Sequence, residues 1–359
     1  MAGVSAFPPH HDSNPQPALE FVPAFNDISR LMKVLCAALL AATALVWSVP
    51  CQAQSANPTT SAADKSKAKD LLKILHARAP VAGQPFDDRE IEFYLEAESR
   101  KLWADSKVHP LKFDRHTCSL QLPDPPKDKL SSREIATRAE AATLVIGEFS
   151  KDGKKKDLFF QAAGGGFIVD PSGVCLTSLH VTKDKDARGF CAMTRDGQVF
   201  PIREILACEP VNDLAFFQLD LPAGVTLPTL PLAHDPAPLG SPIFVMSHPD
   251  DRFYLLSAGF VARHTLWRTT AGDQAFMTIT ADFAKGSSGC PVIDECGAVV
   301  GIVNNTESIY YDDDGHRRQT DLQMVVKNAT PSWAVRPMLE NSNGTSASSP
   351  TPAALFKKP

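Results

Sequence analysis

The chain has 359 residues, a formal net charge of −5 and 43% hydrophobic residues, which is enough apolar material to build a real core in one large or two ordinary domains. Its 36 basic residues do not outnumber its 41 acidic ones, so neither nucleic acid nor an anionic membrane surface is an expected partner.

The segment from Met32 to Ala53 has the layout of a secretory signal peptide. Lys33 precedes an apolar stretch that ends at Val49, and the small residues around Ala53 favour cleavage after it. The stretch is shorter than the roughly 18 to 20 residues of a spanning helix, although a retained membrane anchor stays an alternative. Residues 1–31 are rich in proline and unlike a signal, so a disordered or non-coding leader is expected there and Met32 is a second candidate start. Either start predicts a secreted or periplasmic protein.

Six cysteines follow the signal segment, and in an oxidising compartment an even number favours disulfides of unknown connectivity. No CxxC pair and no His/Cys cluster with zinc-ligand spacing occurs, so neither a metal nor another cofactor is expected. The acidic stretch 310–318 lacks the spaced ligands of a calcium loop. The six cysteines are Cys118, Cys175, Cys191, Cys208, Cys290 and Cys296.

The first part of the mature chain predicts helices. Residues 54–63 are small and polar, which predicts a linker. Apolar residues recur every three or four positions over 64–79 and again over 87–104, which predicts two amphipathic helices within a helical N-terminal region, 64–125. Three roles stay open for this region: a pro-segment, an oligomerisation element or a packed accessory region.

From about residue 140 the chain becomes a series of short apolar runs separated by Gly, Asp and Pro turns, which predicts an all-β domain over 140–340. Thr330 and Pro331 resemble a helix N-cap and first helical residue, so a short helix to about Glu340 is expected to end this domain. The tail, 341–359, is rich in Ser, Thr, Pro and Asn and is predicted to be disordered.

Ser288 lies in the tight glycine frame GSSGCP, residues 286–291. A serine nucleophile needs a base, a group that orients the base, and backbone N–H donors for the oxyanion. The glycines allow a sharp turn in which the N–H groups of Gly286 and Ser288 converge. Taken alone, the motif fits an ordinary turn between strands equally well.

Two partners are available upstream. His180 ends the apolar run VCLTSLHV, and Asp213 directly precedes the apolar run LAFFQL. Each alone fits a strand-end or turn residue. Together with Ser288 they occur in an all-β context in the order His, Asp, Ser.

This combination resembles the chymotrypsin-fold serine peptidases, most closely their compact bacterial trypsin-like and HtrA-like members. The residues that carry the resemblance span about 140–340: GGGFIV (164–169), LTSLHV (176–181), NDLAFFQLD (212–220), GSPIFVMSHP (240–249), and GSSGCPVID with GAVVGIV (286–303). The resemblance implies two six-stranded β-barrels with the site in the cleft between them, here with an N-terminal helical extension and a short C-terminal helix.

The resemblance also implies roles for single residues. Ser288 is expected to be the nucleophile, His180 the general base and then acid, and Asp213 the carboxylate that fixes the imidazole tautomer. The N–H groups of Gly286 and Ser288 are expected to bind the oxyanion. The strand from Ile302 to Thr306 is expected to pair with an extended polypeptide substrate, so Asn304 and Asn305 are candidate substrate-binding residues.

Two residues depart from the family pattern, and the role of a third is open. Ser287 stands where trypsin has the aspartate that pairs with a new N-terminus, so activation by that ion pair is not expected. Cys290 replaces the second glycine of the GxSGGP frame, and three alternatives stay open for its thiol: a bridge to Cys296, another pairing, or no pairing. Asp282 has the offset of the acid in a basic-specific S1 pocket, and a surface or structural aspartate is the alternative.

Two other functions are alternatives to an exported serine endopeptidase. An α/β-hydrolase has a G-x-S-x-G elbow and the order Ser, Asp, His, whereas this chain has Cys290 at the last position and the opposite order. A non-catalytic peptide-binding protein on the peptidase fold is the more serious alternative. The presence of His180, Asp213 and Ser288 together argues against it.

Overall fold

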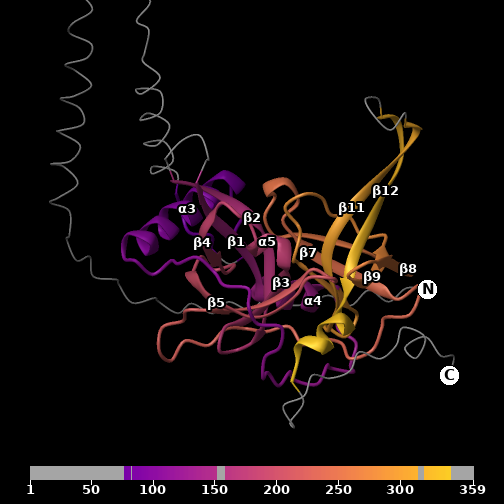
Figure 1. Cartoon of the computed structure of the whole chain (residues 1–359), viewed down its shortest axis with the longest axis horizontal. Coiled ribbons are helices and arrows are strands. Elements are labelled where there is room, and N and C mark those ends of the chain that lie inside the picture. Colours follow the sequence, from indigo (N-terminus) through magenta and orange to yellow (C-terminus); the bar gives the residue numbers. More distant parts are fainter. Residues whose placement is uncertain (1–76, 82, 152–157, 314–318, 341–359) are drawn as a thin grey trace, which may run out of the picture. The chain divides into compact units, whose positions relative to one another are not determined.

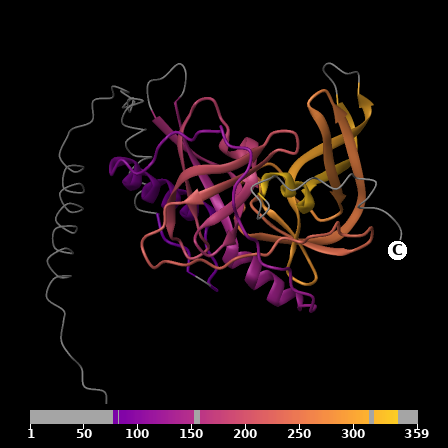
Figure 2. The same ribbon diagram turned by 60° about the horizontal axis from the view of Figure 1, so that its bottom comes forward.

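Twelve strands form two closed barrels of six strands each in the part of the chain that the structure describes. The structure is a computed structural model and describes residues 77–81, 83–151, 158–313 and 319–340. Figures 1 and 2 show one barrel made by the earlier strands and another made by the later ones. The expected all-β fold with two six-stranded barrels is therefore confirmed.

The first barrel has the strand order β1-β2-β3-β6-β5-β4, and β1 closes it by pairing antiparallel with β4. A tight turn at Gly173, with φ +87°, joins the second strand to the third. The strands are β1 (Thr143–Lys151), β2 (Leu158–Asp170), β3 (Val174–Ser178), β4 (Ala187–Met193), β5 (Val199–Glu209) and β6 (Leu214–Leu219), with the one-turn helix α5 (Leu179–Thr182) after β3.

The second barrel has the order β10-β11-β12-β9-β8-β7 and closes through β7 and β10. Beyond the barrel, the far ends of β11 and β12 pair only with each other among the described strands, and Figure 1 shows them as a projecting ribbon. The elements are β7 (Pro242–Ser247), the 3₁₀ turn η1 (Pro249–Asp251), β8 (Leu255–Thr269), β9 (Gly272–Ile279), β10 (Pro291–Asp294), β11 (Val299–Asp313) and β12 (Gln319–Pro331).

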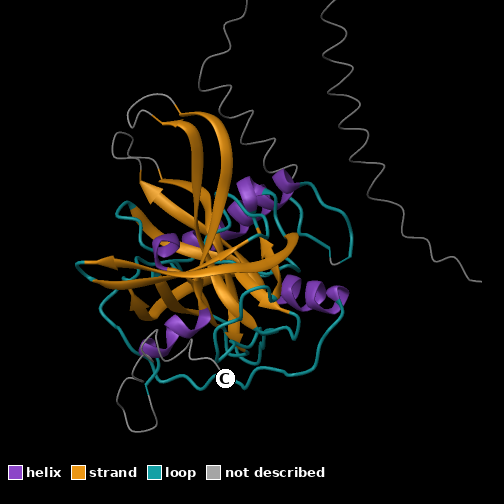
Figure 3. Ribbon diagram, turned by 90° about the vertical axis from the view of Figure 1, so that its right-hand side faces the viewer, coloured by secondary structure: helices purple, strands orange, loops and turns teal. Residues whose placement is uncertain are grey.

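Helices lie against the outside of the strands (Figure 3). The predicted helix over 87–104 is present as α3 (Asp88–Ala104), and its Trp103 packs on Phe149 of β1 with ring centroids 4.9 Å apart. This cover explains why β1 is buried along nearly its whole length instead of alternating. The other predicted helix, 64–79, lies largely outside the described residues, and residues 77–79 are irregular.

A second helix, α4 (Ser132–Ala142), was not predicted, although its sequence carries the signal. The Ser131 hydroxyl accepts from the Glu134 N–H, and the Glu134 carboxylate accepts from the Ser131 N–H, which is a complete capping box. This helix leads directly into β1.

The predicted C-terminal helix was misplaced. Thr330 and Pro331 end β12 instead of capping a helix, and a 3₁₀ segment, η2 (Ser332–Met338), follows them. The hydroxyl of Thr330 is used inside the fold, where it donates to the Asn212 carbonyl oxygen.

The expectation of disulfides is wrong for the six cysteines of the described residues, because all six are free thiols. Cys290 is fully buried, whereas the thiol of Cys296 lies beside the Lys127 carbonyl oxygen, so no bridge spans their hairpin. The signal segment, 32–53, lies outside the described residues. Among the residues that are described, no helix is long and apolar enough to cross a membrane.

Candidate active site

The His180 imidazole is held by two contacts with Asp213. Its Nδ1 lies 2.6 Å from Asp213 Oδ2, and the His180 backbone N–H donates to Oδ1 at 2.9 Å. Because a carboxylate only accepts hydrogen bonds, the contact selects the tautomer with the proton on Nδ1, which leaves Nε2 free to accept a proton. The His180 side chain is 51% exposed, so a substrate can reach it.

Local backbone structure sets this contact. His180 lies in α5, the single helical turn after β3, and Asp213 ends the turn that precedes β6. Asp213 has φ +57°, a left-handed conformation in which Asp is more frequent than most residues, and its carbonyl oxygen accepts from the Leu179 N–H at 2.9 Å. Backbone and side chain of Asp213 therefore both fasten the segment that carries His180.

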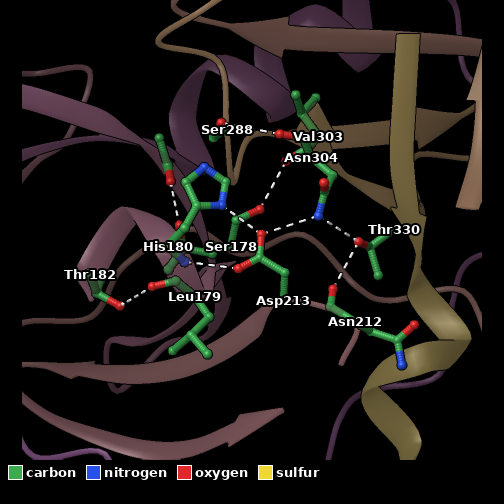
Figure 4. Close-up of polar contacts among 12 residues, drawn as sticks. Ser178, Leu179, His180, Thr182, Asn212, Asp213, Ser288, Val303, Asn304 and Thr330 are labelled. Carbon is green, nitrogen blue, oxygen red and sulfur yellow. Dashed lines mark hydrogen bonds and ion pairs between the residues drawn. The ribbon is translucent and has the colours of Figure 1, made fainter. Parts of the chain in front are cut away.

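Asn304 of β11 joins this pair from the other barrel. Its Nδ2 donates to Asp213 Oδ2 at 3.1 Å and to Thr330 Oγ1 at 3.2 Å. Thr330 in turn donates to the Asn212 carbonyl oxygen at 3.0 Å. This chain of hydrogen bonds crosses from the second barrel to the turn that carries Asp213 (Figure 4).

Ser288 lies in the loop between β9 and β10, close to the same junction. Its hydroxyl donates to the Asn304 carbonyl oxygen at 3.3 Å, and among the described residues it makes no hydrogen bond to His180. In the view of Figure 4, the imidazole lies between Asp213 and Ser288. This hydrogen bond is long and therefore weak, so it opposes rotation of the hydroxyl toward His180 Nε2 only slightly.

Residues 284–288, which we call the 284–288 loop, make a sharp turn at Gly286, with φ +92°. A Cβ atom added at Gly286 would lie 2.7 Å from the His248 carbonyl oxygen, so only glycine fits there. The N–H groups of Gly286 and Ser288 make no hydrogen bond to any described residue. Two unused N–H donors beside a serine can stabilise an oxyanion.

Known proteins share sequence with the part of the chain that carries these residues. Residues 164–302 match the family model of the trypsin-like peptidase domain. The chain contains a trypsin-like peptidase domain. It is similar to the serine endoprotease DegS of Escherichia coli K12, with 26% identity over 190 residues, which cover 52% of this chain and 51% of DegS.

Two further relatives of the trypsin-like peptidase domain are more distant or shorter matches. The putative serine protease HhoA of Synechocystis is 31% identical over 146 residues, 39% of this chain and 36% of HhoA. A probable periplasmic DegP-like serine endoprotease of Brucella suis is 25% identical over 141 residues, 39% of this chain and 27% of that protein. The chain thus spans about half the length of DegS, and less of the other two.

The cysteine in the peptidase domain's GSSGCP motif is a packing residue. The Cys290 thiol is buried against Gly165, where an added Cβ would come within 2.2 Å of Sγ. Burial raises the pKa of Cys290 well above its ordinary value, which keeps the thiol protonated and unreactive. Gly165 therefore makes room for the Cys290 side chain, and Gly164 makes room for the Ser288 carbonyl oxygen, which would lie 3.0 Å from an added Cβ.

The candidate substrate-binding residues are placed differently from one another. The Asn304 side chain points to Asp213, so only its backbone faces Ser288. Asn305 is exposed, and its Oδ1 accepts from Asn328 Nδ2 at 3.1 Å. Sequence reasoning missed the role of Asn304 in holding Asp213, because no motif indicates which way that side chain turns.

Asp282 does not lie at the base of a pocket. Its side chain is 89% exposed and pairs with Lys327 Nζ at 3.1 Å. The surface alternative therefore describes it, and a charge already paired with a lysine is poorly placed to bind an arginine substrate.

We expect Asp282→Asn to leave the preference for the residue before the cleaved bond unchanged. The ratio of kcat/KM for two peptides that differ only in Arg or Leu at that position should stay within about twofold of the wild-type ratio, because an exposed ion pair contributes little. A fall of about tenfold in the preference for Arg would restore Asp282 as a specificity residue.

His248, just after β7, is a buried histidine that sequence reasoning missed. Its Nδ1 accepts from the Tyr254 N–H at 3.1 Å and its Nε2–H donates to the Leu144 carbonyl oxygen at 3.1 Å, a pattern that only the neutral ring satisfies. Burial accordingly lowers the pKa of His248 to about 4.

This burial predicts a pH-dependent stability. Between pH 6.5 and 4, His248 binds a proton in the unfolded chain but not in the folded one. The stabilisation from its neutral folded ring is therefore complete above pH 6.5 and is lost toward pH 4, which lowers the free energy of unfolding by about 3 kcal/mol. Urea unfolding at pH 7.5 and pH 4 of the wild type and of His248→Asn, which keeps an acceptor for Tyr254, measures it. The difference in the free energy of unfolding between the two proteins should be smaller at pH 4 than at pH 7.5 by that amount. An equal difference at both pH values would contradict a buried, neutral His248.

Proposed function

We propose that the protein is an exported serine endopeptidase that cleaves polypeptides through an acyl-enzyme on Ser288. The observation that carries the proposal is the contact between His180 Nδ1 and Asp213 Oδ2, because it engages Nδ1 and leaves Nε2 available beside a serine at the barrel junction. Export is supported by the similarity to a probable periplasmic serine endoprotease of Brucella suis and by the signal-like segment 32–53.

The proposed reaction begins when His180 Nε2 removes the proton from the Ser288 hydroxyl as the oxygen attacks the substrate carbonyl carbon. The N–H groups of Gly286 and Ser288 stabilise the resulting oxyanion. The C–N bond breaks, His180 gives the proton to the leaving amine, and the acyl group stays on Ser288. Water then attacks the ester carbon while His180 takes its proton, the bond from the acyl carbon to the Ser288 oxygen breaks, and His180 returns the proton to that oxygen as the carboxylic acid leaves.

Substrate is proposed to bind along β11 as an added extended strand. The Asn304 carbonyl oxygen accepts the Ser288 hydroxyl at 3.3 Å, and a substrate N–H can replace that weak partner. The same exchange would free the hydroxyl to turn toward His180. Binding and activation of the serine are thereby coupled through one carbonyl group.

The proposal is tested by incubating the purified protein with a peptide library and identifying the products by mass spectrometry. We expect internal cleavages with the wild type and none with Ser288→Ala. A wild type that binds library peptides without cutting any of them would make the protein a peptide-binding module on the peptidase fold.

A further inference from the structure

The turn that follows β7, residues 248–254, packs directly on the 284–288 loop. The Asp250 N–H donates to the Lys285 carbonyl oxygen at 2.6 Å. The His248 carbonyl oxygen lies against Gly286, where it leaves no room for a Cβ atom. Since Gly286 is a proposed oxyanion donor, the position of this 248–254 turn determines where that donor lies.

The 248–254 turn has a strained backbone. Asp250, Asp251 and Tyr254 have φ of 50°, 60° and 58°. Non-glycine residues in this left-handed region store strain of about 1 kcal/mol or more each, and such conformations persist only where surrounding contacts impose them. The Tyr254 N–H donates to His248 Nδ1 within the turn, and contacts from outside the turn add to its support.

That support comes from residues just before and at the start of α3. Asp88 Oδ1 accepts from the Phe253 N–H at 3.0 Å. The Phe86 ring meets Tyr254 edge to face, with centroids 6.5 Å apart at 87°. Phe86 and Asp88 lie far upstream of residues 164–302, which match the peptidase domain.

A buried arginine locks the aromatic part of this contact. The Arg195 guanidinium lies 4.9 Å from the centre of the Phe86 ring and 5.3 Å from that of Tyr254. Its Nε donates to Glu140 of α4 at 2.5 Å, so the cation is paired as well as stacked. The N-terminal segment that carries Phe86 and Asp88 therefore packs on the 248–254 turn, which in turn packs on the 284–288 loop.

We propose that Phe86 and Asp88 position the Gly286 oxyanion donor through the 248–254 turn, so that the N-terminal segment is required for full turnover. This inference rests on the proposed peptidase function. Both side chains act through the turn and neither touches Ser288, so they are positioning residues. Losing them should slow the chemical step and leave substrate binding along β11 intact.

The test compares Asp88→Ala in the full chain with two controls. Asp88→Asn keeps an oxygen acceptor for the Phe253 N–H, and Glu90→Ala removes another first-turn carboxylate of α3, one that makes no hydrogen bond or ion pair with the described residues of the turn. We expect Asp88→Ala to lower kcat about tenfold with KM within about twofold, and both controls to stay near wild type. The rate of reaction with a fluorophosphonate should fall by the same factor as kcat.

A second readout separates positioning from general damage. The downfield proton resonance of the His180–Asp213 hydrogen bond should be unchanged in Asp88→Ala. Loss of that resonance, or wild-type kcat in a folded Asp88→Ala protein, would overturn the inference. If Asp88→Ala does not fold, Phe86→Leu decides, because leucine keeps the apolar contact and loses the stacking: an unchanged kcat refutes the inference, and a several-fold lower kcat with the resonance intact supports it. An inert wild type would instead refute the peptidase function itself.

Discussion

Ser288→Ala is expected to lower kcat for peptide cleavage at least about 10⁴-fold, because the substitution removes the attacking oxygen. The hydroxyl makes a single hydrogen bond of 3.3 Å to a carbonyl, so the free energy of unfolding should change by no more than about 1 kcal/mol. Steady-state cleavage of one peptide found in the library, together with urea unfolding of the same preparation, measures both effects.

Ser287→Ala is the matched control for this substitution. Ser287 is buried next to Ser288, and its hydroxyl finds no hydrogen-bond partner among the described residues. Removing a buried, unpaired hydroxyl should leave stability the same or slightly higher, and kcat near the wild-type value. Equal losses of activity in the two variants would show that the loop tolerates no change, and would remove the case for Ser288 as nucleophile.

Asp213→Asn is expected to lower kcat by about 10³ to 10⁴-fold without unfolding the protein. Asparagine tolerates the left-handed φ of 57°, so the turn is kept. Its amide oxygen should face the His180 N–H, which puts the amide NH₂ opposite His180 Nδ1. That arrangement favours the tautomer with the proton on Nε2, which cannot accept a proton from Ser288.

The NH₂ group of this variant would also face Asn304 Nδ2, another donor. The measurement is kcat/KM at pH 7 with the downfield proton spectrum, in which the His180–Asp213 resonance should disappear. Asp220→Asn, at an exposed aspartate just after β6, is the charge control and should behave as wild type. Activity of Asp213→Asn within about tenfold of wild type would contradict the role of Asp213 in orienting His180.

Much of the architecture could be predicted from the chain, because short apolar runs between Gly, Asp and Pro turns are a local property. The grouping of His180, Asp213 and Ser288 came from their order and from the family resemblance. The structure joins the first two directly and links Ser288 to them through Asn304. The roles of the three stay predictions.

What the sequence did not predict depends on contacts between distant segments. The strand register shifts between Val303 and Asn305, so alternation along β11 could not tell that the Asn304 side chain turns to Asp213. Thr330 and Pro331 suit the start of a helix as well as the end of a strand. An even number of cysteines does not show whether any two of them lie close enough in space to form a disulfide. Asp282 has the sequence offset of an acid at the base of an S1 pocket, but its side chain is exposed.

The most direct measurement is the intact mass of the folded protein after reaction with a fluorophosphonate, followed by peptide mapping. We predict one adduct per chain, on Ser288, and none in Ser288→Ala. No adduct on the folded wild type, or an adduct on a different residue, would contradict Ser288 as an activated nucleophile.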